Sequence, residues 1–287
     1  MQITLENVTH TYQPGSPFQA TAIRNVNMEV GAGEFLALIG HTGSGKSTLA
    51  QHLNGLIRPT EGCVRIDGQD IHEKGYDKKE VRRKVGLVFQ YPEHQLFEET
   101  VVKDVAFGPR NLGLSAGEAD DRVREALAKV GLSYDDMAER SPFELSGGQM
   151  RRVAIAGVLA MRPECLVLDE PAAGLDPQSR EEMLELISSL HQSGSTVVMI
   201  SHSMDDVARF ATRAVVMEKG TVAMEGAPEE IFLHAGRLAG MGLDVPKVCQ
   251  LGLRLREEGL PFPAGIFREE DAAAAILSLW KEGKAHV

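Results

Sequence analysis

A glycine-rich segment from Gly40 to Ser47 carries the clearest chemistry in the chain. It reads GHTGSGKS and matches the pattern GxxxxGK[ST] in full. Glycines let backbone N–H groups turn toward phosphate oxygens, and a helix start directly after them adds a positive dipole end. We therefore expect a nucleoside triphosphate to bind here, with Lys46 on the β- and γ-phosphates and Ser47 on Mg²⁺. The phosphate-binding residues predicted are Gly40, His41, Thr42, Gly43, Ser44, Gly45, Lys46, Ser47 and Thr48.

A second anion site is expected where LSGGQ begins a helix. Ser146 is a good N-cap, and Gly147 and Gly148 leave backbone N–H groups open at the positive helix end. A helix cap alone would explain the serine but not the two glycines. Because the chain already has a phosphate loop, we expect Ser146, Gly147, Gly148 and Gln149 to bind a phosphate held by another subunit.

Two acidic residues end an apolar strand. The sequence LVLDE places Asp169 and Glu170 at the carboxyl edge of the expected sheet. Asp169 is expected near the Mg²⁺ that Ser47 holds, and Glu170 is expected to accept a proton from the attacking water. An ordinary acidic turn after a strand remains the alternative.

Two polar residues follow other apolar strands. Gln90 ends the strand 85–89, where its amide could contact the metal or the water. His202 follows the strand 197–201 and is expected to contact the γ-phosphate, although a lone histidine usually has a structural role. The predicted catalytic residues are Glu170, His202 and Gln90, and the predicted metal ligands are Ser47, Gln90 and Asp169.

These residues need a sheet to position them. The apolar run 35–39 leads into the glycine loop, and the helix 46–56 follows it. Further buried strands are expected at 85–89, 165–168 and 196–201, with helices between them, which indicates a parallel sheet. The alternating segments 3–9 and 23–30 read as strands, the first of them an edge strand. Residues 91–160 read as a helical insertion.

The combination of these motifs resembles the ATP-binding cassette (ABC) ATPases. The glycine loop, Gln90, LSGGQ, LVLDEP, GLD and His202 carry the resemblance, which covers residues 1–235. It implies an α/β fold of the P-loop NTPase type: a mostly parallel sheet, an antiparallel β edge, a helical signature subdomain at 91–160, and a helical C-terminal extension at 236–287. It also implies a head-to-tail dimer that holds two ATP molecules with Mg²⁺. Asp176 would then lie at the dimer contact, and Tyr12 would stack on adenine unless it is only a loop tyrosine.

A second run indicates a subgroup. FQYPEHQLF at 89–97, with Thr100-Val101 and 106–109, looks like the A subunits of energy-coupling factor transporters, most like the second of the paired ATPases. The resemblance implies uptake of vitamins, cobalt or nickel through a membrane T component and a substrate-binding S component. A second ATPase, identical or related, completes the dimer, and the extension 236–287 contributes to their contact. Glu93, Gln95, Leu96 and Phe97 would form a groove for the T component; packing of the helical insertion is the alternative.

Composition limits the other possibilities. The net charge of −11 disfavours binding to nucleic acid or directly to anionic lipid. Three separated cysteines favour neither a disulfide nor a zinc site, and no apolar run reaches the ~20 residues that span a bilayer. We expect a peripheral protein, not inserted in the membrane, that a protein partner holds at the cytoplasmic face. The rivals are a conventional ABC importer or exporter ATPase and, less favoured, a soluble ABC ATPase of DNA repair or translation.

Overall fold

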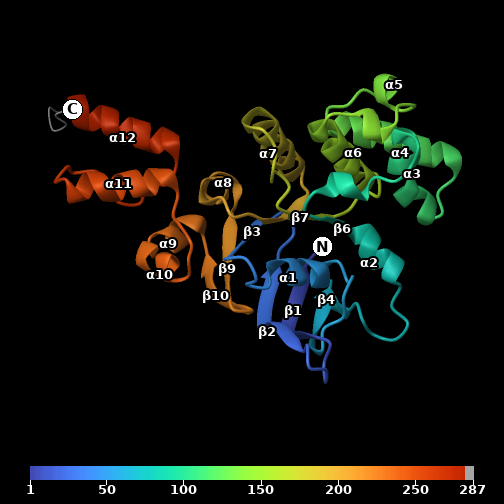
Figure 1. The fold of residues 1–287 in the computed structure, drawn as a ribbon, viewed down its shortest axis with the longest axis horizontal. Coiled ribbons are helices and arrows are strands. Elements are labelled where there is room, and N and C mark those ends of the chain that lie inside the picture. The colour runs from blue at the N-terminus through green and yellow to red at the C-terminus, as the bar shows by residue number, and fades with distance from the viewer. Residues whose placement is uncertain (282–287) are drawn as a thin grey trace. The chain divides into compact units, whose positions relative to one another are not determined.

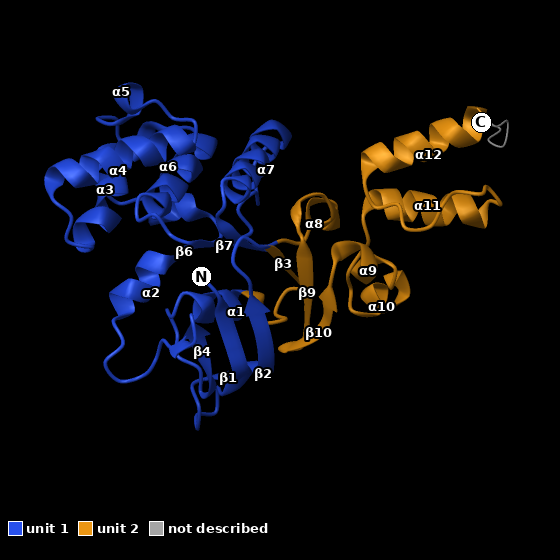
Figure 2. Cartoon of the chain, turned by 180° about the vertical axis from the view of Figure 1, so that it is seen from behind, with its two compact units in different colours: residues 1–34, 47–200 blue, residues 35–46, 201–287 orange. Residues whose placement is uncertain are grey.

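The computed structural model describes residues 1–281, which form two compact units (Figure 2). Unit 1 comprises residues 1–34 and 47–200, and unit 2 comprises residues 35–46 and the chain from 201 onward. The division predicted at residue 235 stays a prediction. Residues 282–287 of the predicted C-terminal extension lie outside the described residues.

Unit 1 contains an antiparallel sheet of four strands in the order β2-β1-β4-β5 (Figure 1). Ile3, Leu5 and Val8 of β1 are buried, and a register shift between Leu5 and Val8 interrupts the alternation that the sequence predicted. The expectation that this strand lies at an edge is wrong, because β1 pairs with β2 on one side and β4 on the other. The strands are β1 (Ile3–Tyr12), β2 (Ala20–Val30), β4 (Glu61–Ile66) and β5 (Gln69–Asp70).

Three parallel strands of unit 1 present the predicted acidic edge. β6 (Val85–Val88) pairs with β7 (Cys165–Asp169), which pairs with β8 (Thr196–Ile200). Every residue of β7 and β8 is buried, which explains their continuous apolar sequences. Helix α7 (Pro177–Gln192) joins β7 to β8. Because β6 and β7 are parallel, Gln90, which follows β6, and Glu170, which follows β7, lie at the same edge of the sheet.

The helical insertion predicted at 91–160 is confirmed. Its helices α3, α4 and α6 pack on one another through fully buried side chains, among them Val105, Val123 and Val153. The elements of this segment are η1 (Pro92–Gln95), α3 (Val101–Asn111), α4 (Ala116–Lys129), α5 (Tyr134–Met137), η2 (Pro142–Glu144) and α6 (Gly147–Leu159). The other helices before it are α1 (Lys46–Leu53) and α2 (Lys78–Lys84).

Unit 2 is built on strand β3 (Phe35–Ile39), which pairs in parallel with β9 (Arg213–Glu218). β10 (Thr221–Gly226) pairs with β9 in the antiparallel sense. In the C-terminal part, Val248, Phe262 and Ala272 form a small buried cluster between α11 and α12. The helices of unit 2 are α8 (Met204–Phe210), α9 (Pro228–Phe232), α10 (Ala235–Gly240), α11 (Lys247–Glu257) and α12 (Glu269–Lys281).

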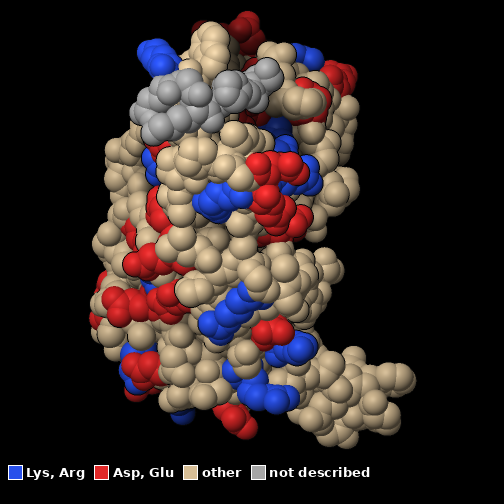
Figure 3. Space-filling view, turned by 90° about the vertical axis from the view of Figure 1, so that its left-hand side faces the viewer, with Lys and Arg blue, Asp and Glu red and all other residues tan. Residues whose placement is uncertain are grey.

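Two surface properties bear on possible partners. Among residues 1–281, the structure has no helix with both the length and the apolar character that crossing a bilayer requires. On the face drawn in Figure 3, Lys and Arg side chains are interspersed with Asp and Glu and form no continuous basic surface. That face therefore offers no broad cationic platform for phosphate backbones.

His52, in the last turn of α1, makes stability depend on pH. Its ring is fully buried, and Nδ1 donates to the carbonyl oxygen of Thr48 at 2.8 Å. Burial lowers the pKa of His52 to about 4; the hydrogen bond to Thr48 opposes this, and the charges of His10 and His72 add to it. The native ring is therefore neutral near pH 6, where the unfolded ring binds a proton.

We expect the free energy of unfolding to fall as the pH is lowered from about 6.5 to about 4, by roughly 3 kcal/mol from this residue. The unfolded state binds more protons in that range, so stability rises with pH. Urea unfolding across this range, compared with His52→Gln, measures the effect. An equal pH dependence in both proteins would contradict the assignment to His52.

Candidate nucleotide-binding and hydrolysis site

The phosphate loop follows a buried strand and leads into a helix, as predicted. Gly40, Gly43 and Gly45 have φ angles of 153°, 80° and 103°, which side chains disfavour. A Cβ at Gly40 would overlap the carbonyl oxygen of Met217 and lie 2.6 Å from Oγ of Ser44. The loop therefore lies so close to the neighbouring backbone that only glycine fits there. Such a cradle suits phosphate oxygens, which backbone N–H groups can approach directly.

Lys46 lies across the inside of this loop. Its Nζ donates to the carbonyl oxygens of Gly40 and His41 at 2.7 and 3.0 Å, and the side chain is buried. The loop is also braced by the backbone N–H of Gly220, which donates to the carbonyl of Ser44 at 3.1 Å. A buried ammonium held by neutral carbonyls can transfer its hydrogen bonds to stronger anionic acceptors such as phosphate.

Tyr12 is the last residue of strand β1, whereas the alternative to adenine stacking placed it in a loop. Its hydroxyl is 3.2 Å from Oγ1 of Thr48, in the first turn of α1. The ring of His10 packs edge-on against the tyrosine ring at 4.6 Å between centroids. The ring is nevertheless 41% exposed, so one aromatic surface beside the start of α1 is open to a flat ligand.

The predicted general base lies beside the predicted water-orienting amide. Nε2 of Gln90 donates to Oε2 of Glu170 at 3.1 Å. The register Val88↔Leu168 explains this proximity, because each residue stands two positions beyond its partnered strand residue. Glu170 has a left-handed φ of 48°, and its N–H donates to the carbonyl of Ile200 at 3.1 Å. Asp169, the last residue of β7, is buried.

The predicted γ-phosphate contact, His202, belongs to unit 2. It is exposed and stands between Ser201, whose N–H donates to the carbonyl of Leu38, and Ser203, the N-cap of α8. Its role stays a prediction.

The signature segment begins helix α6, and the predicted N-cap is confirmed. The N–H of Gln149 donates to Oγ of Ser146 at 3.3 Å, and Oε1 of Gln149 accepts from the N–H of Ser146 at 3.1 Å. Ser146, Gly148 and Gln149 border a cavity of about 290 Å³ that also contacts α7. This open helix start can accept an anion. The side chain of Gln149 already serves the cap.

Asp176 has a local structural role as well as its predicted dimer contact. Its Oδ1 accepts hydrogen bonds from the N–H groups of Gln178 and Ser179, both at 3.1 Å, and so caps α7. Hydrogen bonds from Ser179 and Gln178 lower the pKa of Asp176. The carboxylate is thus held ionised at the exposed end of the turn that follows Glu170.

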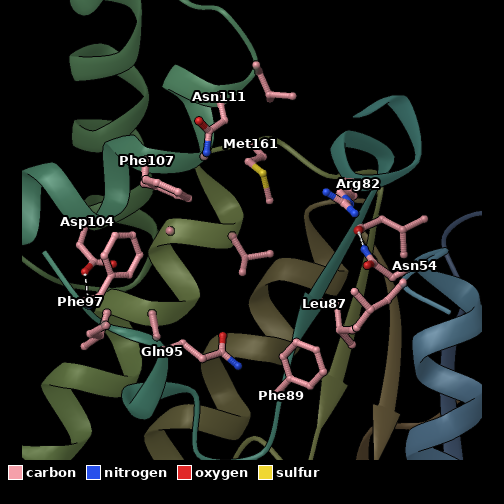
Figure 4. Close-up of a pocket in the computed structure, with 18 of the residues that line it drawn as sticks. Asn54, Arg82, Leu87, Phe89, Gln95, Phe97, Asp104, Phe107, Asn111 and Met161 are labelled. Atoms are coloured by element: carbon pink, nitrogen blue, oxygen red, sulfur yellow. Dashed lines mark hydrogen bonds between the residues drawn. The ribbon is translucent and has the colours of Figure 1, made fainter. Parts of the chain in front are cut away.

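A cavity of about 610 Å³ lies between the helical insertion and strand β6 (Figure 4). Gln95, Leu96 and Phe97 line it as predicted, whereas Glu93 does not. The ring of Phe97 is 57% exposed and packs edge-to-face on Phe107 at 4.9 Å. Sequence reasoning missed the other lining residues, among them Asp104 and Phe107, whose helical spacing of three residues was a usable signal.

Asp104 is one of the polar residues that line this cavity. Its Oδ2 accepts the backbone N–H of Phe97 at 2.9 Å (Figure 4) and that of Glu98 at 3.0 Å. The carboxylate therefore orders the loop that displays Phe97. The remaining lining residues are mainly apolar, with Asn54, Lys79, Arg82 and Asn111 as the polar ones.

Residues 23–173 match the family model described as ABC transporter, and this range contains the phosphate loop, Gln90, the signature and Glu170. The chain is a member of the ABC transporter family. The "Energy-coupling factor transporter ATP-binding protein EcfA2" of Clostridium tetani is 52% identical over 281 residues, covering 98% of each chain. The protein of the same name from Symbiobacterium thermophilum is 54% identical over 276 residues, covering 96% of each. These matches confirm the resemblance to the energy-coupling factor ATPases.

Solved structures of ABC proteins have the same fold. CbiO1 from Clostridium perfringens, described as part of the ABC transporter complex cbiONQ, matches with a TM-score of 0.72 and 34% identity, over 90% of this chain and 96% of that one. A post-hydrolysis dimer of the ATP-binding cassette MJ0796, bound to ADP and Pi, matches with a TM-score of 0.70 and 34% identity, over 79% and 98% of the two chains. The predicted ABC ATPase fold is confirmed.

Proposed function

We propose that this chain is the ATP-hydrolysing subunit of an energy-coupling factor importer. The observation that carries the proposal is the match to energy-coupling factor ATPases along 98% of both chains, which includes the C-terminal segment beyond the family core. The contact of 3.1 Å between Gln90 and Glu170 supports hydrolysis as the activity. ATP closes a dimer of ATPase subunits, and hydrolysis reopens it.

The phosphate loop binds ATP in this proposal. Residues 40–48 hold the phosphates, and Tyr12 stacks on adenine. The hydroxyl of Ser47, the carboxylate of Asp169 and the amide oxygen of Gln90 form the kind of oxygen-donor set that Mg²⁺ prefers. When bound, Mg²⁺ neutralises charge on the β- and γ-phosphates.

Glu170 accepts a proton from the water that attacks the γ-phosphate. Gln90, hydrogen-bonded to the same carboxylate, orients that water, and His202 contacts the γ-phosphate. Residues 146–149 complete the site of the partner ATPase in the head-to-tail dimer, and Asp176 lies at the dimer contact. Each ATP is therefore held by two subunits.

The cavity beside the helical insertion receives the T component. Gln95, Leu96 and Phe97, which line the cavity, follow Gln90 closely in the sequence. A helix bound there therefore contacts the same segment that reaches the nucleotide site. The small S component binds the substrate, a vitamin or a cobalt or nickel ion, and the T component converts the motion of the ATPases into its reorientation. Both hold the chain at the cytoplasmic face of the membrane. The apolar lining with Phe97 and Phe107 suits an amphipathic helix.

Replacement of Phe97 tests this docking. We expect Phe97→Ala to lower co-purification of the T component from detergent-solubilised membranes by about tenfold or more. An aromatic side chain that becomes buried on docking supplies that much affinity. Hydrolysis by the free ATPase should be unchanged. Phe18→Ala is the matched control, since Phe18 is 80% exposed and does not line the cavity. Equal recovery of the T component with Phe97→Ala would contradict this docking site.

A further inference from the structure

Arg151 is a fully buried cation that sequence reasoning did not single out. It lies on α6, two residues after the LSGGQ motif, and only 2% of its side chain is exposed. Its Nε and Nη2 donate to the two carboxylate oxygens of Glu93 at 2.9 and 2.7 Å. Its Nη1 donates to the carbonyl oxygens of Pro171 and Ala173 at 3.1 and 2.7 Å.

These partners belong to two catalytic segments. Glu93 lies three residues after Gln90, in the short helix η1. Pro171 and Ala173 form the turn directly after Glu170, which is closed by a hydrogen bond from the N–H of Ala173 to the carbonyl of Glu170 at 3.1 Å. One guanidinium therefore joins the segment after Gln90 to the segment after Glu170.

The geometry needs an arginine. A guanidinium offers five N–H donors in a fixed planar fork, and this one uses both edges, whereas a lysine ammonium is a single point. Glu93 is itself only 15% exposed, and although burial raises the pKa of its carboxyl, the hydrogen bonds from Arg151 lower it below the usual value. The pair is thus ionised and buried, an arrangement that would be costly as mere packing.

Glu170 needs such support. Its φ of 48° is strained for a residue with a side chain, and such strain persists only where neighbouring contacts hold it. Arg151 fixes the turn after Glu170 through hydrogen bonds to two carbonyl oxygens, and it fixes the segment after Gln90 through Glu93. The 3.1 Å contact between Gln90 and Glu170 is therefore held from both sides.

We propose that Arg151 is a positioning residue for ATP hydrolysis, which holds Glu170 and Gln90 in register and links both to the signature helix. The inference rests on the proposed function, in which Glu170 activates water. Glu93 also precedes Gln95, Leu96 and Phe97, which line the T-component cavity. When these residues move, Arg151 therefore transmits the movement through Glu93 to the turn after Glu170. In this proposal Arg151 acts only through Glu93 and the turn after Glu170.

Single replacements separate positioning from binding. We expect Arg151→Met to lower kcat for ATP by about 100-fold, as a small misplacement of a catalytic group does, with ATP affinity nearly unchanged. Arg151→Lys should give an intermediate kcat. The control is Arg83→Met, because Arg83 makes the same two-bond contact with Glu80, at 2.9 and 2.6 Å, but on the exposed helix α2. It should leave kcat unchanged.

A double replacement separates positioning from folding. Replacing both members of a buried pair with apolar residues often restores stability, so Arg151→Met with Glu93→Leu should have a higher Tm than Arg151→Met alone. Its kcat should stay low, because the bonds to Pro171 and Ala173 are still missing. Recovery of kcat together with Tm would overturn the inference, as would a normal kcat in Arg151→Met. If Glu170→Gln kept full turnover, the proposed function would fail instead.

Discussion

Glu170→Gln is expected to lower ATP turnover by about 10³-fold while ATP still binds. The amide has the shape of the carboxylate and can still accept a hydrogen bond from Gln90, but it cannot take a proton from water. The full-length chain, purified with the ATPase partner with which it assembles, is assayed for phosphate release and separately for ATP affinity.

The control for this variant is a glutamate outside the site. Glu99→Gln removes an exposed carboxylate just before α3 that pairs with Lys103 at 2.8 Å on the protein surface, and turnover should be normal. Full turnover in Glu170→Gln would remove the residue from the role of base. Loss of ATP binding together with turnover would indicate that Glu170 supports the nucleotide site rather than the reaction.

Lys46→Ala should weaken ATP binding by roughly 30- to 150-fold, because hydrogen bonds to charged groups contribute about 2–3 kcal/mol. The ammonium now held by the carbonyls of Gly40 and His41 lies within the loop in which the phosphates are proposed to bind. Calorimetric titration with ATP measures the dissociation constant directly.

Lys247→Ala is the matched control for Lys46. Lys247 belongs to the same unit, and its side chain is exposed beside Asp205 at the start of α11, so its loss removes an equal charge away from the loop. ATP affinity should be unchanged in this control. Unchanged affinity in Lys46→Ala would contradict the assignment of the phosphate cradle.

The sequence was sufficient wherever local rules decide the outcome. The strand–loop–helix around Gly40 follows from a continuous apolar run and the glycine spacing, and the cap at Ser146 follows from helix-end chemistry. The closeness of Gln90 and Glu170 follows from the rule that parallel strands end at one edge.

Other features depend on neighbours that lie far away in the sequence. The strand β4 was not predicted, because its buried apolar pattern is limited to Val64 and Ile66, and β1 was therefore wrongly placed at an edge. The strands β9 and β10 were missed, although the buried apolar run 214–217 inside β9 was a usable signal; β10 is only partly buried and carries a weaker pattern. The pairing of Arg151 with Glu93 spans 58 residues, and no local pattern encodes it.

The most direct test of the proposed function is the identity of the membrane proteins that stay bound to the tagged full-length chain after detergent solubilisation. Mass spectrometry of the purified complex measures it. The proposed function predicts a second ATPase, one T component and a small S component in the same complex. Two conventional permease subunits, with neither of these components, would contradict it.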